Sequence, residues 1–311
     1  MSSLSMRHLL GLRDAKPNDL RVILDTTRSF RSILDRPVKK VPSMRGLTVV
    51  NLFFEDSTRT RISFELAEKR LSADLVNFAS SGSSLKKGET ILDTLRNIEA
   101  MKIDLVVVRH SGTGVPAFLA KHSNAIIVNA GDGANEHPTQ ALLDMYTLEQ
   151  ELGSLRGKTV CIVGDVRHSR VARSNIWGLS ALGAKVRVCG PSTLLPKNPA
   201  EFQNVVFTTD VRHAVNNADA VIALRLQKER QDDNLLPSLR EYRNFFGITE
   251  EVLESSKAGV KIMHPGPINR GVELDSTVAD GSNSVILEQV SNGVAVRMAI
   301  LYLLSGGLAH E

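Results

Sequence analysis

Residues 47–71 read LTVVNLFFEDSTRTRISFELAEKRL, and this stretch predicts a strand that runs directly into a helix. Residues 47–54 are apolar and rich in β-branched and aromatic side chains, which favours a buried strand, whereas residues 58–71 have the apolar spacing of an amphipathic helix. Ser57 or Thr58 occupies the position of a helix N-cap. Alternation of buried strands with helices is typical of α/β proteins, so this stretch predicts that class.

Two arginines lie at the N-terminal end of this predicted helix, where a positive charge is least favourable. Arg59 and Arg61 fall in the first turn, whose unpaired backbone N–H groups already make the site electropositive. A bound phosphate would resolve this conflict, held by backbone N–H groups, by the hydroxyls of Ser57, Thr58 and Thr60, and by a guanidinium. The alternative that stays open is a capped surface helix with two solvated arginines. We favour the anion site because hydroxyls and arginines cluster directly after a buried strand.

The composition is that of a globular protein and argues against a nucleic-acid-binding or a membrane protein. A chain of 311 residues can bury a substantial core, and its length suggests two domains. Lys and Arg (38) exceed Asp and Glu (34) by only four, and with three Tyr and one Trp a basic, aromatic surface for nucleic acid is not expected. We recognise no signal-peptide region and no membrane-spanning stretch, and Cys161 and Cys189 lie in strand-like runs typical of buried reduced thiols. We therefore expect a cytoplasmic protein without a membrane partner.

Strand-like and helix-like segments alternate along the whole chain, which favours parallel sheets covered by helices. Strands are predicted at 47–54, 74–78, 104–109, 125–129, 158–164, 184–189, 204–207, 219–225 and 259–263. Helices are predicted at 17–34, 58–71, 89–101, 115–122, 138–152, 170–181, 210–217 and about 284–304. A Ser-rich loop is expected at 79–88, and a linker at 153–158 separates two αβ runs.

Residues 129–140 read NAGDGANEHPTQ and connect a predicted strand to a predicted helix. His137 precedes Pro138 and is therefore kept extended, so its imidazole can project from the mouth of the helix, with Gln140 on the first turn. The helix N-terminus disfavours an imidazolium, and a neutral ring could donate one N–H to a carbonyl oxygen. A purely structural histidine stays open as the alternative.

Two further strand ends carry arginines. Residues 159–165 resemble the start of a nucleotide-binding unit, but only Gly164 of the expected glycines is present, so we expect no dinucleotide cofactor. Arg170 is the first residue of the next predicted helix, and an arginine at this positive end favours the binding of a carboxylate. Arg225 and Gln227 lie at the end of strand 219–225 on one face, at the edge where ligands of open α/β sheets bind. A solvated surface arginine remains the alternative for Arg170, and an ordinary polar strand end remains the alternative for Arg225 and Gln227.

A rigid loop follows the last predicted strand. Pro265, Gly266 and Pro267 offer backbone carbonyl oxygens, useful for an amine or amide group, and the Gly266–Pro267 bond is a candidate for the cis form. The alternative is a plain turn. By its composition, the loop that holds Ser83 and Lys87 has the look of a solvated linker.

Together these segments resemble the aspartate/ornithine carbamoyltransferase family over nearly the whole chain. Residues 57–61 resemble its carbamoyl-phosphate signature, and residues 137–140 resemble its second signature. Ser83 with 87–89, residues 225–227 and residues 264–267 resemble the aspartate-specific members, whereas ornithine-specific members tend to carry Cys-Leu-Pro near the last position. One departure is Gly266, which stands where many members have leucine.

The resemblance implies two domains, each a mainly parallel sheet flanked by helices. Residues 1–148 would bind carbamoyl phosphate, with the C-terminal helix 286–305 packed back on them, and residues 149–285 would bind aspartate. It also implies a homotrimer with shared active sites, in which Ser83 and Lys87 reach into a neighbouring pocket. No metal or cofactor is implied. A regulatory chain or a dihydroorotase is an open partner.

The activity that the resemblance implies is transfer of the carbamoyl group from carbamoyl phosphate to L-aspartate, in pyrimidine synthesis. The implied catalytic residues are Arg59, Thr60, Arg109 and His137. The implied substrate-binding residues are Ser57, Thr58, Ser83, Lys87, Gln140, Arg170, Arg225, Gln227, Pro265, Gly266 and Pro267. We expect these groups to converge on one pocket. Ornithine carbamoyltransferase activity and a non-catalytic subunit of a pyrimidine-pathway complex remain as alternatives.

Overall fold

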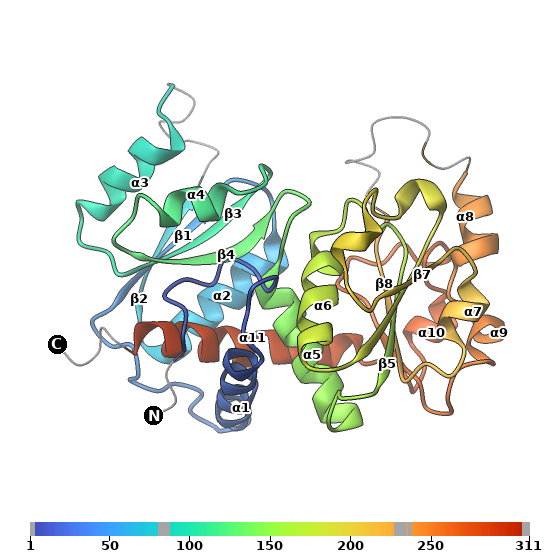
Figure 1. Cartoon of the computed structure of the whole chain (residues 1–311). Helices are drawn as coiled ribbons and strands as arrows, with labels where there is room; N and C mark the ends of the chain where they lie inside the picture. The colour runs from blue at the N-terminus through green and yellow to red at the C-terminus, as the bar shows by residue number, and fades with distance from the viewer. Residues whose placement is uncertain (1–3, 80–87, 227–234, 236–237, 307–311) are drawn as a thin grey trace. The chain divides into compact units, whose positions relative to one another are not determined.

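The computed structural model describes residues 4–79, 88–226, 235 and 238–306 (Figure 1). Three predicted site residues, Ser83, Lys87 and Gln227, lie outside the described residues. The chain divides into two compact units, residues 1–142 with 292–311 and residues 143–291. Each unit is built on a parallel sheet flanked by helices, which confirms the predicted α/β class. No described helix is long and apolar enough to cross a lipid bilayer.

The sheet of the first unit has four parallel strands in the order β2-β1-β3-β4. They are β1 (Thr48–Phe53), β2 (Asp74–Ala79), β3 (Leu105–His110) and β4 (Ile126–Asp132). The helices are α1 (Pro17–Leu34), α2 (Thr58–Leu71), α3 (Ile91–Glu99), α4 (Val115–Ala120), the start of α5 (Pro138–Leu152) and most of α11 (Ile286–Ser305). Residues of β1 and β3 are almost continuously buried, as expected for parallel strands covered on both faces.

The last helix packs against α1 and α2 within the first unit. The Arg297 guanidinium lies 5.0 Å from the centroid of the Phe64 ring, and its Nη1 donates a hydrogen bond to Ser63 Oγ at 3.0 Å. The rings of Phe30 and Tyr302 meet edge-on with their centroids 5.5 Å apart. Residues 292–305 are therefore part of the core of the first unit, although they come last in the chain.

The sheet of the second unit has five parallel strands in the order β7-β6-β5-β8-β9. They are β5 (Thr159–Val163), β6 (Lys185–Cys189), β7 (Val206–Thr208), β8 (Ala220–Ala223) and β9 (Lys261–Met263). The helices that lie wholly in this unit are α6 (Arg170–Ala181), α7 (Val211–Val215), α8 (Leu239–Phe246), α9 (Glu250–Leu253) and α10 (Ser276–Ala279), with 3-10 turns at Ser192–Leu194 and Pro199–Glu201. Its core contains Val163, Val221, Ile262 and Leu274, all of them buried.

The structure differs from the sequence prediction in three short helices, α8, α9 and α10, which the apolar spacing does not reveal. These helices are too short for a repeating pattern, and two of them begin at side-chain caps. The Ser238 hydroxyl accepts a hydrogen bond from the Glu241 N–H, and the Thr249 hydroxyl accepts one from the Val252 N–H. Strand β8 is also shorter than predicted, so Arg225 lies two residues beyond its end.

Both cysteines are buried free thiols, as predicted. Burial raises the pKa of Cys161 and of Cys189 to about 12, so neither forms a thiolate near neutral pH. The Cys161 Sγ donates to the carbonyl oxygen of Ala214 at 2.6 Å. These side chains therefore belong to the core of the second unit and supply no nucleophile.

The buried face of α2 in the first unit carries a carboxyl group. Glu68 is fully buried, and its Oε2 accepts a hydrogen bond from Asn51 Nδ2 at 3.0 Å. Desolvation raises the pKa of Glu68 to about 8, against the opposing effect of the Asn51 hydrogen bond. The Glu68 side chain therefore carries a proton in the folded protein at neutral pH.

This burial predicts that stability falls with rising pH through the Glu68 side chain. Its pKa in the folded state lies above the unfolded value of about 4.5, so between about pH 4.5 and 8 the unfolded chain has lost a proton that the folded chain retains. In Glu68→Gln this side chain stays neutral at every pH. The free energy of unfolding of the variant minus that of the wild type should therefore increase by at least about 1 kcal/mol from pH 5 to pH 8. Urea unfolding of both proteins at several pH values measures this difference, and a constant difference would contradict the assignment.

Candidate active site

The carboxyl ends of β1, β3 and β4 meet at one edge of the first sheet, because all four strands are parallel. Arg109 lies at this edge, near the end of β3, with 11% of its side chain exposed. Its Nη2 forms an ion pair with Glu55 Oε1 at 2.6 Å, and its Nη1 donates to the carbonyl oxygen of Ala130 at 3.1 Å. The predicted arginine is thus held in place from both neighbouring strand ends.

His137 joins Arg109 at this edge. The imidazole is buried, and its Nε2 lies 3.5 Å from Arg109 Nη1. Pro138, which follows it, is the first residue of α5, so His137 lies at the mouth of this helix, as predicted. A guanidinium this close opposes a second positive charge and favours a neutral imidazole, which has one N–H to donate. Gln140 lies in the first turn of α5 and is partly buried.

The N-terminus of α2 lies at the same edge, after β1. Ser57 is the N-cap residue, but its hydroxyl makes no capping hydrogen bond, and the first turn contains no acidic residue. Thr60 is buried there, whereas Thr58 and Arg59 are exposed. Arg61 lies away from this group, with its Nε 3.7 Å from Glu65 Oε1. The first turn therefore offers hydroxyls and a positive helix end to an anion.

Glu55 is a functional candidate that the sequence reasoning missed. It lies two residues after the end of β1 and supplies the carboxylate that pairs with Arg109. Its place in the first residues after a strand, beside the predicted anion site, was the available signal. The pairing depends on the β1–β3 register, in which Phe53 lies opposite Arg109, and that register is not visible in the sequence.

The second unit brings another set of side chains to the carboxyl edge of its own sheet. Arg170 is buried as the first residue of α6, whose N-cap Ser169 accepts a hydrogen bond from the Ala172 N–H. Arg225 is partly buried just beyond β8. His168, which sequence reasoning also missed, has its Nδ1 2.9 Å from Oδ1 of the buried Asp165. Arg170 and Arg225 make this edge electropositive, and the buried Asp165 carboxylate offsets part of that charge.

The loop after β9 is rigidly held. The Gly266–Pro267 peptide bond is cis, in agreement with the sequence prediction. The buried His264 accepts a hydrogen bond from the Gly266 N–H at its Nδ1 (2.8 Å), which leaves the ring proton on Nε2, 3.3 Å from Glu273 Oε1. The His264 N–H in turn donates to Gln289 Oε1 at 3.0 Å. The start of the loop is thus held by Gln289 and Glu273, two side chains from outside it.

A buried amide–carboxylate network supports that loop from behind. Asp144, on α5, is fully buried and accepts hydrogen bonds from Asn175 Nδ2 at 2.7 Å and from Gln289 Nε2 at 2.8 Å. Because Gln289 also accepts the His264 N–H, the network runs from α6 through α5 and α11 to the loop after β9. Side chains of α5, α6 and α11 therefore hold the backbone of His264, the residue before Pro265.

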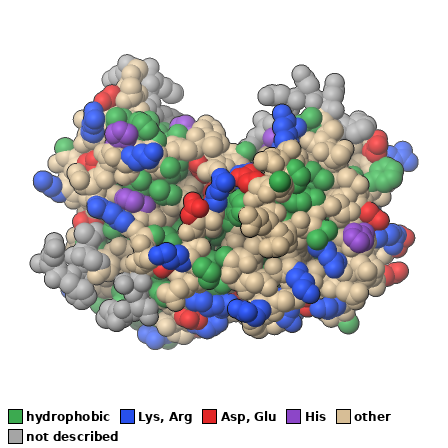
Figure 2. Space-filling model, in the orientation of Figure 1, with side chains coloured by type: hydrophobic (Ala, Val, Ile, Leu, Met, Phe, Trp, Pro, Cys, Tyr) green, Lys and Arg blue, Asp and Glu red, His purple; other side chains and the backbone are tan. Residues whose placement is uncertain are grey.

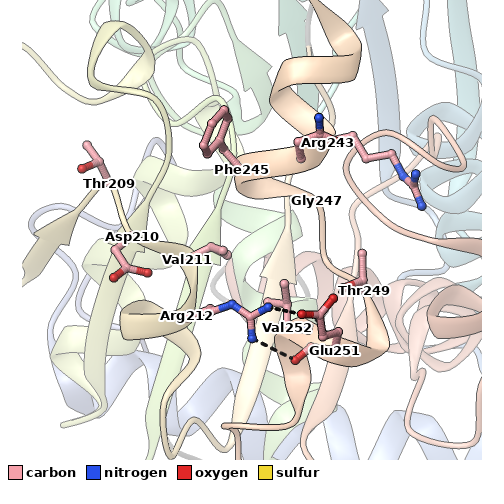
Figure 3. Close-up of a pocket in the computed structure, with 11 residues that line it drawn as sticks. Thr209, Asp210, Val211, Arg212, Arg243, Phe245, Gly247, Thr249, Glu251 and Val252 are labelled. Atoms are coloured by element: carbon pink, nitrogen blue, oxygen red, sulfur yellow. Dashed lines mark hydrogen bonds and ion pairs between the residues drawn. The ribbon is translucent and has the colours of Figure 1, made fainter.

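A surface pocket of the second unit is separate from this site. It has a volume of about 520 Å³ and lies between α7, α8 and α9, where Arg212 pairs with Glu251 at 2.5 Å (Figure 3). Phe245 lies at its rim and the Arg243 guanidinium points away, toward Asp275 (Nη2 to Oδ1, 2.9 Å). None of the predicted site residues lines it.

Charge is spread over the surface of both units. On the face shown in Figure 2, basic and acidic side chains lie on each unit, in keeping with the net charge of +4. Within residues 4–79, 88–226 and 238–306, no group of three or more His, Cys, Asp or Glu side chains is arranged to hold a metal ion.

The sequence matches two family models. The one described as "Aspartate/ornithine carbamoyltransferase, carbamoyl-P binding domain" matches residues 7–150. The one described as "Aspartate/ornithine carbamoyltransferase, Asp/Orn binding domain" matches residues 156–304. Together the two models account for nearly the whole chain.

Curated relatives and solved structures agree with these matches. The aspartate carbamoyltransferase catalytic subunit of Cytophaga hutchinsonii is 57% identical over 98% of this chain and 99% of its own, and that of Gemmatimonas aurantiaca is 60% identical over 97% and 94%. Aspartate transcarbamoylase from Trypanosoma cruzi, solved with carbamoyl aspartate and phosphate, has a TM-score of 0.85 at 30% identity and 95% coverage of both chains. Ornithine carbamoyltransferase from Pyrococcus furiosus has a TM-score of 0.87 at 28% identity and 99% coverage of both.

The network behind the loop predicts a specific loss of stability. Asp144→Ala leaves the buried amide groups of Asn175 and Gln289 without this acceptor, so the free energy of unfolding should fall by about 2–4 kcal/mol. Urea unfolding measures the loss. The surface ion pair of Asp25 with Arg28 offers a control, and Asp25→Ala should change stability little. Equal effects of the two substitutions would show that the Asp144 network does not stabilise the second unit.

Proposed function

The chain belongs to the aspartate/ornithine carbamoyltransferase family, and we propose that it transfers the carbamoyl group of carbamoyl phosphate to the amine of L-aspartate. The products would be N-carbamoyl-L-aspartate and phosphate. The observation that carries this proposal is 57–60% identity, over nearly the whole chain, with aspartate carbamoyltransferase catalytic subunits. The arginines and histidine at the carboxyl edges of the two sheets supply the chemistry that the reaction needs.

The proposal divides the substrates between two domains. Residues 1–148, with helix 286–305, would bind carbamoyl phosphate, and residues 149–285 would bind aspartate. The matched family models support this division through their descriptions as carbamoyl-P binding and Asp/Orn binding domains. For catalysis the two sets of residues must face one pocket, which is part of the proposal.

The phosphate of the first substrate would lie at the N-terminus of α2. Backbone N–H groups there, the hydroxyls of Ser57 and Thr58, and the Arg59 guanidinium would hold its oxygens. Arg109 would approach from β3. Because Glu55 already pairs with Arg109, the incoming phosphate competes with a carboxylate for the same guanidinium. Glu55 would thus balance the charge of Arg109 before the substrate binds, and the phosphate would balance it afterwards.

The carbamoyl carbonyl oxygen would face Thr60, Arg109 and His137. Negative charge builds on this oxygen when the amine attacks, so donors placed there stabilise the transition state more than the substrate. Gln140 and the carbonyl oxygens of Pro265 and Gly266 would orient the carbamoyl NH2 and the attacking amine. The departing phosphate is a suitable proton acceptor, so catalysis would rest on proximity and electrostatics.

The two carboxylates of aspartate would bind to Arg170, Arg225 and Gln227. Arginine forks match carboxylates bidentately, and Arg170 gains from its place at a helix N-terminus, where an anion is favoured. Pro267, in its cis peptide, would complete the loop that borders this substrate. Gln227 lies outside the described residues, so its part rests on the resemblance alone.

The proposal includes a homotrimer with shared sites, in which Ser83 and Lys87 of one chain complete the pocket of another. In support, α2 exposes Ile62 and Leu66 on one face, and the edge strand β2 exposes Val76. Exposed apolar side chains beside an open sheet edge favour burial against a second chain. A regulatory chain or a dihydroorotase stays open as a further partner. The free thiols of Cys161 and Cys189 fit the cytoplasmic location that we also propose.

Ornithine carbamoyltransferase is the second candidate, because the Pyrococcus furiosus enzyme has a TM-score of 0.87. The shared fold does not separate the two activities. Residues 225–227 and 264–267 favour aspartate, because they resemble the aspartate-specific members of the family and because a guanidinium such as that of Arg225 suits a second carboxylate.

Substrate choice tests the proposal directly. Phosphate release from carbamoyl phosphate should be at least about 100-fold faster with L-aspartate than with L-ornithine, because Arg170 and Arg225 attract a second carboxylate and repel an ammonium group. Arg59→Ala should lower kcat/KM for carbamoyl phosphate by about 100-fold or more, since it removes a charged phosphate ligand. Faster release with ornithine would overturn the assignment, and no release with either would favour a non-catalytic role.

Substitutions of His137 and of Arg225 should change different kinetic parameters, kcat for His137 and KM for Arg225. His137→Ala removes a donor to the developing oxyanion, so kcat should fall by about 10²–10³-fold with little change in KM for aspartate. Arg225→Ala removes a substrate carboxylate contact and should raise that KM by about tenfold or more. Steady-state kinetics with both substrates varied separates the two effects, and the reverse pattern would contradict the assigned roles.

A further inference from the structure

The N-terminal segment of the chain lies beside β4, at the edge of the first sheet. The Leu9 N–H donates to the Ile127 carbonyl at 3.0 Å, and the Asn129 N–H donates to the Leu9 carbonyl at 2.8 Å. Leu9 thus forms a parallel bridge with Val128, and the buried side chains of Leu9 and Leu12 anchor the segment. Residues 9–13 therefore lie against the strand that leads to His137.

Glu136, the residue before His137, binds this segment through its side chain. Its carboxylate accepts hydrogen bonds from the backbone N–H of Leu12 at 2.7 Å and of Arg13 at 3.1 Å. The Glu136 side chain is 5% exposed, so these charge-assisted bonds are shielded from water. We call this contact between Glu136 and residues 12–13 the Glu136 clamp.

The backbone of Glu136 is fixed as well. Its N–H donates to Asp132 Oδ1 at 3.1 Å, and Asp132 Oδ1 also accepts from Asn129 Nδ2 at 2.8 Å. Asn129 Nδ2 in addition donates to the Leu10 carbonyl at 2.8 Å, which ties the same loop to the N-terminal segment a second time. The loop that ends at His137 is therefore held by its own buried side chains and by the start of the chain.

We propose that Glu136 is a positioning residue for His137, and that residues 11–13 take part in catalysis through it. The inference rests on the proposed function. A donor to an oxyanion must be held to within about 0.5 Å, and a misplacement of about 1 Å costs roughly 100-fold in rate. The clamp acts one residue from the imidazole, whereas the carboxylate of Glu136 itself faces the N-terminal backbone.

Gly11 offers a way to disturb the clamp without changing any side chain of the site. A Cβ at residue 11 would overlap Glu136 Oε1 and would lie 2.8 Å from Glu136 Cδ, too close for the carboxylate to stay in place. The backbone of Gly11 is not in the left-handed region, so an alanine there brings no strain of its own. Gly11→Ala should therefore push the carboxylate away from Leu12 and Arg13.

The test compares kcat for Gly11→Ala, Glu136→Ala, Glu136→Gln and a matched control. At saturating substrates, kcat should fall about tenfold or more in Gly11→Ala and Glu136→Ala, with KM for aspartate changed less than about twofold. Glu136→Gln keeps one acceptor oxygen and should be intermediate. Gly11→Ala should have little further effect in the Glu136→Ala background, because both act through one contact.

The control is Asp104→Ala. Asp104 also accepts a backbone N–H in the first unit, that of Thr48 at 2.7 Å, but at the amino end of β3, away from the site. It should lower the thermal midpoint yet leave kcat within about twofold. Wild-type kcat in all clamp variants, or an equal loss in Asp104→Ala, would overturn the inference.

A second readout does not depend on activity. With 13C-labelled histidine, the His137 imidazole signal, assigned through His137→Asn, should shift in Gly11→Ala and Glu136→Ala and stay unchanged in Asp104→Ala. An unchanged His137 signal in both clamp variants would overturn the inference even if the wild type proved inactive. An inactive wild type with shifted signals would instead count against the proposed function and leave the positioning of His137 by Glu136 supported.

Discussion

Every strand pairing between the named strands β1–β9 is parallel, and the arrangement of candidate residues depends on that constraint. A parallel neighbour requires the chain to cross back over the sheet, so each strand ends at the same edge as the one before. In each unit that edge collects helix N-termini, whose partial positive charge favours anions. Arg59, Arg109 and His137 gather in the first unit in this way, and Arg170 and Arg225 in the second.

Carboxylates that are buried or partly buried hold these basic and amide side chains in position. Glu55 balances Arg109, Asp165 contacts His168, and Asp144 accepts two amide groups behind the loop after β9. Each such group must be satisfied, because an unpaired buried charge is costly. The result is a set of side chains with little freedom before substrate arrives, which suits a reaction that depends on orientation and electrostatics.

Much of this could be predicted from the sequence. Long strands and helices such as β1, α2 and α5 have a strong apolar pattern, and the cluster at Ser57–Arg61 conflicts with a plain surface helix. Glu55 and the Glu136 clamp could not be predicted, since they depend on strand register and on contacts more than 100 residues apart. Helices α8 to α10 were missed because they are too short for a repeating apolar pattern, and side-chain caps mark the start of only α8 and α9. Substrate preference likewise lies in side chains, as the close fit to an ornithine enzyme illustrates.

The division of the chain has a consequence for its synthesis. Residues 292–305 of α11 complete the core around Phe64 and Phe30, yet they are made after the whole of the second unit. On the ribosome, the first 142 residues therefore emerge without one wall of their core and must wait for about 150 more residues, at roughly 5–20 residues per second, before that wall exists. The second unit is contiguous and can fold as it appears, so the unit made first is the one finished last.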